Sequence, residues 1–121
     1  MPGILLIDDT PETAELLTFA LRDRGYDVFA TGYTTSINEL LAEHAADAVV
    51  LDCSGFDMSE SVFLSLRSRS EHADLPVVII TDTPEKAAAN LSAQDARRVL
   101  LVQKPFTGGQ VAGALGQLLQ R

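Results

Sequence analysis

Ile4-Leu5-Leu6-Ile7-Asp8-Asp9 is the stretch that decides the fold, because four apolar residues in a row meet two acids at once. An uninterrupted apolar run of this length is typical of a strand buried on both faces, as in a parallel sheet. Similar runs occupy residues 48–51, 77–80 and 99–102, and a weaker one occupies 28–30. The chain therefore predicts five strands.

Segments with helical spacing alternate with these runs. Thr10-Pro11 and Thr83-Pro84 each indicate a helix start, with threonine as the cap and proline at the first helical position. We expect helices over 11–25, 37–45, 59–68, 84–91 and 111–119. Strands alternating with helices predict an α/β fold: a flavodoxin-like, doubly wound, five-stranded parallel sheet of order 2-1-3-4-5. No linker or repeat divides the chain, so we expect one domain over 1–121.

Acidic, hydroxyl or basic side chains follow four of the five predicted strands. Asp8 and Asp9 follow the first, Asp52 the third, Thr81 the fourth and Lys104 the fifth. The carboxyl ends of parallel strands meet at one edge, where open α/β sheets bind ligands. Gathered carboxylates repel one another, and a hard divalent cation with oxygen ligands relieves that repulsion, which favours Mg²⁺. The hydroxyl and the ammonium would then bind oxygens of a phosphoryl group.

The charge balance limits the partners. Acidic residues number 17 and basic residues 9, so the net charge is −8, and no basic stripe exists to follow a nucleic-acid backbone. We expect no direct nucleic-acid contact. The N-terminus has neither a signal peptide nor a membrane span, and a lone cysteine, Cys53, fits a reducing compartment. These features predict a cytoplasmic protein with no membrane contact.

The motifs ILLIDD, VVLDCS, VVIITD and LVQKPF, in this order and spacing, resemble those of two-component response-regulator receiver domains, the CheY-like superfamily. The resemblance implies that Asp52 is phosphorylated by a sensor histidine kinase or a phosphotransfer protein. It also implies that Asp8, Asp9, Asp52 and the backbone carbonyl of Ser54 hold Mg²⁺, with Asp9 favoured as a direct ligand. The chain would accept a phosphoryl group rather than act as an enzyme, with at most slow self-dephosphorylation. The Lys104-Pro105 bond is expected to be cis.

The sequence departs from that family in three places. The loop after Asp52 has no proline and is about two residues short. Asp82 stands where a small residue usually leaves the phosphoryl group access, and Leu101 replaces the usual aromatic switch. We therefore expect slow phosphorylation and a signal that leaves by a route other than the aromatic switch.

Other interpretations stay open at this point. One is a receiver-like interaction module that is never phosphorylated, which Asp82, Leu101 and the short loop favour. A phosphatase of the haloacid-dehalogenase type would need an acid where Ser54 stands. Taken singly, the strand-end residues could be helix caps, turn residues or surface charges. His44 and His72 show no partners at metal spacing.

The output partner is not specified, because the sequence holds no helix-turn-helix, basic region or kinase motif. The resemblance also implies a possible homodimer, because the last helix and its preceding strand often form a dimer face in that family. Leu118 and Leu119 of that helix are equally suited to the core.

Overall fold

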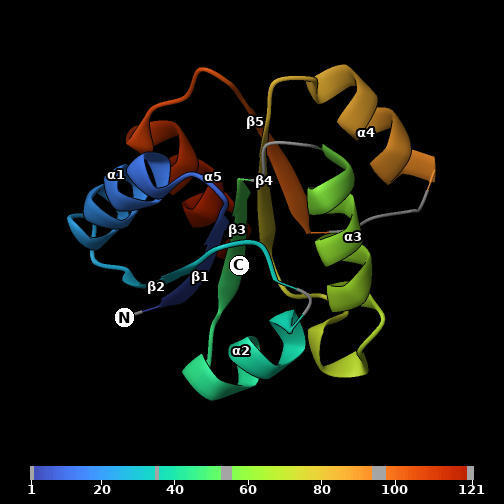
Figure 1. The fold of residues 1–121 in the computed structure, drawn as a ribbon, viewed down its shortest axis with the longest axis horizontal. Helices are drawn as coiled ribbons and strands as arrows, with labels where there is room; N and C mark the ends of the chain where they lie inside the picture. The colour runs from blue at the N-terminus through green and yellow to red at the C-terminus, as the bar shows by residue number, and fades with distance from the viewer. Residues whose placement is uncertain (1, 35, 53–55, 94–97, 120–121) are drawn as a thin grey trace.

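A computed structural model describes residues 2–34, 36–52, 56–93 and 98–119, with the backbone alone at 56–59 and 90–93. The five strands form one parallel sheet of order β2-β1-β3-β4-β5, which confirms the predicted fold (Figure 1). The strands are β1 (Gly3–Asp8), β2 (Asp27–Thr31), β3 (Ala48–Asp52), β4 (Val77–Thr81) and β5 (Val99–Gln103). The helices are α1 (Pro11–Arg22), α2 (Ile37–His44), α3 (Phe56–Arg67), α4 (Pro84–Ala93) and α5 (Gly108–Leu119), and a short 3-10 helix, η1, covers Ser70–His72.

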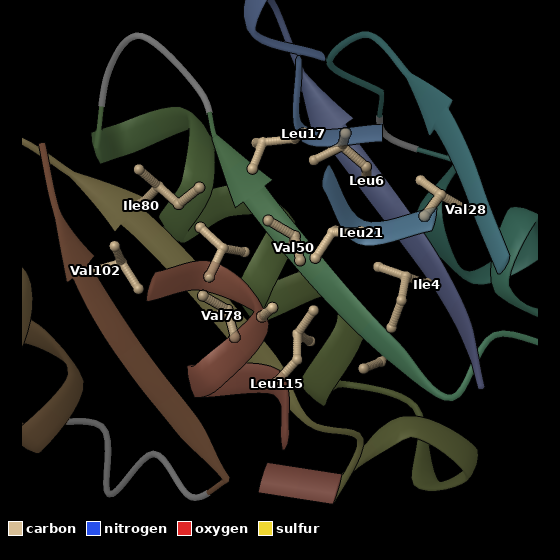
Figure 2. Packing of buried hydrophobic residues seen from close by; sticks show 13 residues of the cluster. Ile4, Leu6, Leu17, Leu21, Val28, Val50, Val78, Ile80, Val102 and Leu115 are labelled. Atoms are coloured by element: carbon tan, nitrogen blue, oxygen red, sulfur yellow. The ribbon is translucent and has the colours of Figure 1, made fainter. Parts of the chain in front are cut away.

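Two apolar cores lie on opposite faces of the sheet. Alternate residues of each strand point to opposite faces, so Ile4 and Leu6 of β1 face one core, while Leu5 and Ile7 face the other. Helices α1 and α5 cover the first face, and α2 and α3 cover the second (Figure 1). Figure 2 shows the first core, built from alternate strand residues and side chains of α1 and α5. Burial on both faces explains why the strands are continuous apolar runs.

The start of α1 differs in detail from the predicted cap. Thr10 does occupy the cap position, but its hydroxyl makes no capping bond. Instead its backbone N–H donates to Asp8 Oδ1 at 2.8 Å. The carboxylate at the end of β1 thus fixes the turn into the helix. The helix ends at Arg22, and Gly25, at φ 92, completes the turn that follows, as expected of a glycine stop.

Helix α3 begins at Phe56, three residues before the predicted start at Ser59, so that boundary was wrong. The prediction rested on the buried stripe of Val62, Phe63 and Leu66, which lies in the later turns. The first turn precedes these three residues in the sequence, so they do not mark where the helix begins.

His72 has a hydrogen-bond partner in the fold, the side chain of Asn38, which is not a metal-ligand pairing. Asn38 is 8% exposed, and its side-chain amide donates to the carbonyl of Ser65 at 3.1 Å. Its Oδ1 is therefore the acceptor for His72 Nδ1, 2.6 Å away. This chain of contacts joins α2, α3 and η1. In the described part of the chain, no helix is long and apolar enough to cross a membrane.

Candidate functional site

The strand ends place two acids side by side. Asp8 closes β1 and Asp52 closes β3, and the register of the two strands pairs them directly. The residues are only 4% and 3% exposed. Two buried carboxylates in adjacent positions repel each other strongly unless a cation or a proton compensates them.

Lys104 supplies one such cation. Its Nζ lies 2.9 Å from Asp52 Oδ1, and its backbone N–H donates to the carbonyl of Thr81 at 2.8 Å. The Lys104-Pro105 peptide bond is cis, as predicted. Burial alone would lower the pKa of Lys104, but the hydrogen bond and charge of Asp52, with the charges of Asp82 and Asp8, raise it. The ammonium is therefore held in its charged form beside Asp52.

Asp8 has one satisfied and one unsatisfied carboxylate oxygen. Its Oδ1 accepts the N–H of Thr10, while Oδ2 is buried without a hydrogen-bond partner among the described residues. Burial raises the pKa of Asp8 from 3.8 to about 7; the Thr10 bond opposes this, and the charges of Asp52 and Asp9 add to it. An oxygen in this state is suited to accept a proton or a metal ion.

The donor set fits a magnesium ion in part. Asp8 and Asp52 offer carboxylate oxygens in one buried position, and Mg²⁺ takes one or two carboxylates while keeping several waters. Across the described residues, no group of three His, Cys, Asp or Glu side chains lies close enough to hold a metal ion. Asp9 is half-buried, and its Oδ1 accepts a long hydrogen bond of 3.5 Å from the hydroxyl of Thr10. The predicted carbonyl ligand, Ser54, lies outside the described residues, and so does Cys53.

Thr81 ends β4 and is 5% exposed. Its Oγ1 accepts the backbone N–H of Thr83 at 3.0 Å and lies 3.3 Å from the hydroxyl of Thr83. The hydroxyl of Thr83 is therefore also next to the site, although the sequence analysis did not include it among the site residues. Its position in the sequence could have indicated this, because Thr83 stands only two residues beyond the end of the strand, directly before Pro84.

The two unusual residues lie where the sequence suggested. Asp82 is exposed, and its charge acts on Lys104, so a further carboxylate stands near the ion pair. Leu101 is half-buried and packs against the second core, opposite Ile79 of β4. A purely apolar side chain in this place has no hydroxyl to change partners when the site changes state.

The parallel sheet and its buried acid–lysine pair define a class of α/β proteins that carry their site at the carboxyl ends of the strands. Comparison with known families gives the same result, since the response regulator receiver domain matches residues 4–115. The chain belongs to this family and is a receiver domain of two-component signalling.

Known relatives agree with this assignment. The probable transcriptional regulatory protein TcrX of Mycobacterium tuberculosis is 35% identical over 120 residues, which cover 98% of the chain and 50% of that protein. The chain thus spans about half the length of this curated relative. A sensor protein from Polaromonas sp. JS666 has the same fold, with a TM-score of 0.83 at 24% identity, covering 97% of this chain and 94% of that one.

The receiver domain of sensor histidine kinase PA1611 from Pseudomonas aeruginosa PAO1 also has the same fold. It superposes with a TM-score of 0.75 at 20% identity, covering 99% of this chain and 98% of that one. Its crystal structure has a magnesium ion coordinated in the active site cleft.

Proposed function

We propose that the chain accepts a phosphoryl group on Asp52 from the phosphohistidine of a sensor histidine kinase or a phosphotransfer protein. The observation that carries the proposal is the 2.9 Å ion pair between Lys104 and a carboxylate that is 3% exposed. Asp8 lies beside it, so the pocket offers acids to a cation and an ammonium to an anion. Phosphoryl transfer needs mainly positioning and charge neutralisation, and these side chains provide both.

In the transfer step, the P–N bond breaks as a P–O bond forms to a carboxylate oxygen of Asp52. The electron pair of the broken bond stays on the imidazole nitrogen, and the ring, already protonated at its other nitrogen, leaves as neutral imidazole. Lys104 Nζ can move from Asp52 Oδ1 to an oxygen of the attached group, because it already lies 2.9 Å away. Thr81 can donate its hydroxyl hydrogen to another oxygen, since the N–H of Thr83 occupies only an acceptor site.

We place a Mg²⁺ ion in the same pocket, held by Asp8, Asp9, Asp52 and the carbonyl of Ser54. The unpartnered, buried Oδ2 of Asp8 supports this assignment. The magnesium ion in the PA1611 receiver domain supports it as well. The chemistry that this ion supplies is neutralisation of charge on the carboxylates and the incoming phosphoryl group.

The phosphorylated chain would act as a switch, not as an enzyme, and would lose its phosphoryl group slowly at most. The added charge, up to about two negative charges, would bias two conformations or a partner surface. The output partner would bind that surface. It would be a protein rather than a nucleic acid, because the chain has a net charge of −8. We place the exchange in the cytoplasm, where a single cysteine stays reduced.

We also propose that phosphorylation is slow. The exposed carboxylate of Asp82 stands close enough to influence Lys104, so it repels an arriving dianion. Replacing Asp82 with alanine should speed acyl-phosphate labelling by a small-molecule donor with Mg²⁺. Rapid labelling that this change leaves as it was would remove the access argument.

The second candidate function is an interaction module with a receiver fold that is never phosphorylated. Two departures from the family pattern occur together and favour it. Asp82 lies close enough for its charge to act on Lys104, and Leu101 stands in place of an aromatic switch. In that case the Asp52–Lys104 pair would only hold the strand ends together.

Binding of fluoroberyllate with Mg²⁺ separates the two functions, because this phosphoryl mimic needs a working acid pocket. The chain has no tryptophan, so fluorine NMR is the suitable readout. The wild type should bind the mimic only with Mg²⁺, and Asp52→Asn should not bind it. Asp23→Asn is the matched control, because that exposed acid lies after α1, away from the strand ends. A wild type that fails to bind the mimic would favour the interaction module.

A further inference from the structure

Thr83 stands between the end of β4 and the start of α4. Its carbonyl accepts the N–H of Ala87 at 3.1 Å, so it occupies the cap position of this helix. Its own N–H donates to Thr81 Oγ1 at 3.0 Å. The turn into α1 is built in the same way, because the N–H of Thr10 donates to Asp8 Oδ1, two residues earlier. At both helix starts, a side chain of the site therefore holds the residue at the cap position.

The hydroxyl of Thr83 contacts the site and not the helix that it precedes. Its Oγ1 lies 3.3 Å from Thr81 Oγ1, and among the described residues it accepts no N–H of α4. Thr107, at the start of α5, is different. Its Oγ1 accepts the N–H of Gln110 at 3.1 Å, and the side chain of Gln110 accepts the N–H of Thr107 at 2.8 Å. The same residue type in the same position thus caps α5 with its side chain but does not cap α4.

Burial indicates which of the two hydroxyls donates in the unphosphorylated protein. Thr81 is 5% exposed, and a buried hydroxyl hydrogen needs an acceptor. Thr83 is exposed, so its own hydrogen can be given to water. Thr81 is therefore the donor and Thr83 the acceptor. At 3.3 Å the contact is longer than the usual O–H···O bond of about 2.5–3.0 Å, so a closer acceptor readily replaces it.

We propose that Thr83 couples the site to α4. When Thr81 donates its hydroxyl hydrogen to a phosphoryl oxygen on Asp52, the hydroxyl of Thr83 is released and accepts an N–H of the first turn of α4. This inference rests on the proposed phosphorylation of Asp52. The step exchanges hydrogen bonds only, and every hydrogen stays on its own oxygen or nitrogen.

The first turn of α4 has N–H groups ready for this acceptor. Pro84 has none, so the groups without an acceptor inside the helix belong to Glu85 and Lys86, which are both exposed. A cap threonine ordinarily accepts from one of these two positions. The change would thus tighten the start of α4, at the surface of the molecule. Leu101 has no hydroxyl that could exchange partners, so this contact supplies a route for the signal that does not need an aromatic switch.

Amide–water exchange measured by NMR tests the proposal on the full chain, with and without Mg²⁺ and fluoroberyllate. Fluorine NMR on the same sample shows whether the mimic is bound. In the wild type, the bound mimic should slow exchange of the N–H of Glu85 or Lys86 about fivefold, because that group gains an acceptor.

Two changes at Thr83 separate coupling from a structural role. Thr83→Val keeps the shape of the side chain but has no hydroxyl. It should bind the mimic about fivefold more weakly and show no slowing, because the cap forms only in the bound state. Thr83→Ser should restore both the affinity and the slowing. Thr107→Val is the matched control. It should speed exchange of the Gln110 N–H with and without the mimic, and it should bind the mimic as the wild type does.

The outcomes distinguish this inference from the function on which it rests. The coupling is overturned, and the phosphorylation stands, if the wild type binds the mimic but neither N–H slows. It is also overturned if the slowing persists in Thr83→Val. A wild type that shows no fluorine signal of bound mimic would overturn both.

Discussion

Replacing Asp8 with asparagine should make the metal-free protein more stable at alkaline pH. The carboxyl group is 4% exposed, and its Oδ2 has no hydrogen-bond partner among the described residues. Burial, with the charges of Asp52 and Asp9, raises its pKa from 3.8 to about 7. Asparagine resembles the neutral acid, because its carbonyl oxygen can still accept the N–H of Thr10.

The sign follows from proton binding. In the unfolded chain Asp8 loses its proton near 3.8, whereas in the folded protein it keeps the proton to about 7. Between these values the folded state binds more protons, so stability falls as pH rises. The full stability is present below 3.8, and the loss is complete above about 7. The difference between the two pKa values corresponds to up to about 4 kcal/mol.

Urea unfolding in the presence of a chelator, repeated from pH 4 to pH 8, measures this effect. Asp8→Asn and the wild type should be equally stable near pH 4, and the variant should gain about 2–4 kcal/mol at pH 8. Excess Mg²⁺ should stabilise the wild type but not the variant. Asp82→Asn, at an exposed acid, should change stability by less than about 0.5 kcal/mol. A variant that is less stable at pH 8, or a gain that does not depend on pH, would refute the reasoning.

Two further changes probe the site and the packing. Lys104→Met leaves the buried carboxylate of Asp52 without its cation, so the free energy of unfolding at pH 7 should fall by about 1–3 kcal/mol, a value reduced for the partial exposure of the lysine. Urea titration measures this loss, and an unchanged midpoint would contradict the prediction. Gly108→Ala places a Cβ 2.5 Å from the Cβ of Ala20, so packing of α5 on α1 should weaken by about 1–3 kcal/mol. Gly113→Ala, with nothing within 4 Å, should instead add about 0.5–1 kcal/mol through helix propensity, and equal effects of the two alanines in thermal melts would count against the packing argument.

The fold was predictable because its determinants are local. Apolar runs such as Ile4–Ile7 mark strands covered on both faces, and Thr-Pro pairs mark helix starts. The grouping of Asp8, Asp52 and Lys104 was predictable for a related reason, since parallel strands end at one edge of the sheet. The structure brings these three side chains together at the predicted edge.

The remaining features depend on contacts between distant segments. His72 and Asn38 are 34 residues apart, and no sequence pattern around either residue predicts the hydrogen bond between them. The raised pKa of Asp8 comes from burial, which follows only once helices cover the strand ends. Arg22 can reach the carbonyl of Val28 because β2 is an outer strand of the sheet. That position depends on the order of the strands and not on the residues near Arg22 in the sequence.

The central claim is that Asp52 accepts a phosphoryl group. The direct measurement treats the protein with a small-molecule phosphoryl donor and Mg²⁺, reduces the product with borohydride and maps the peptides by mass spectrometry. An acyl phosphate on Asp52 would be converted to homoserine at that position alone, and only in samples that contained Mg²⁺. Unmodified Asp52 in folded protein, or homoserine at Asp8 or Asp9 instead, would contradict the account.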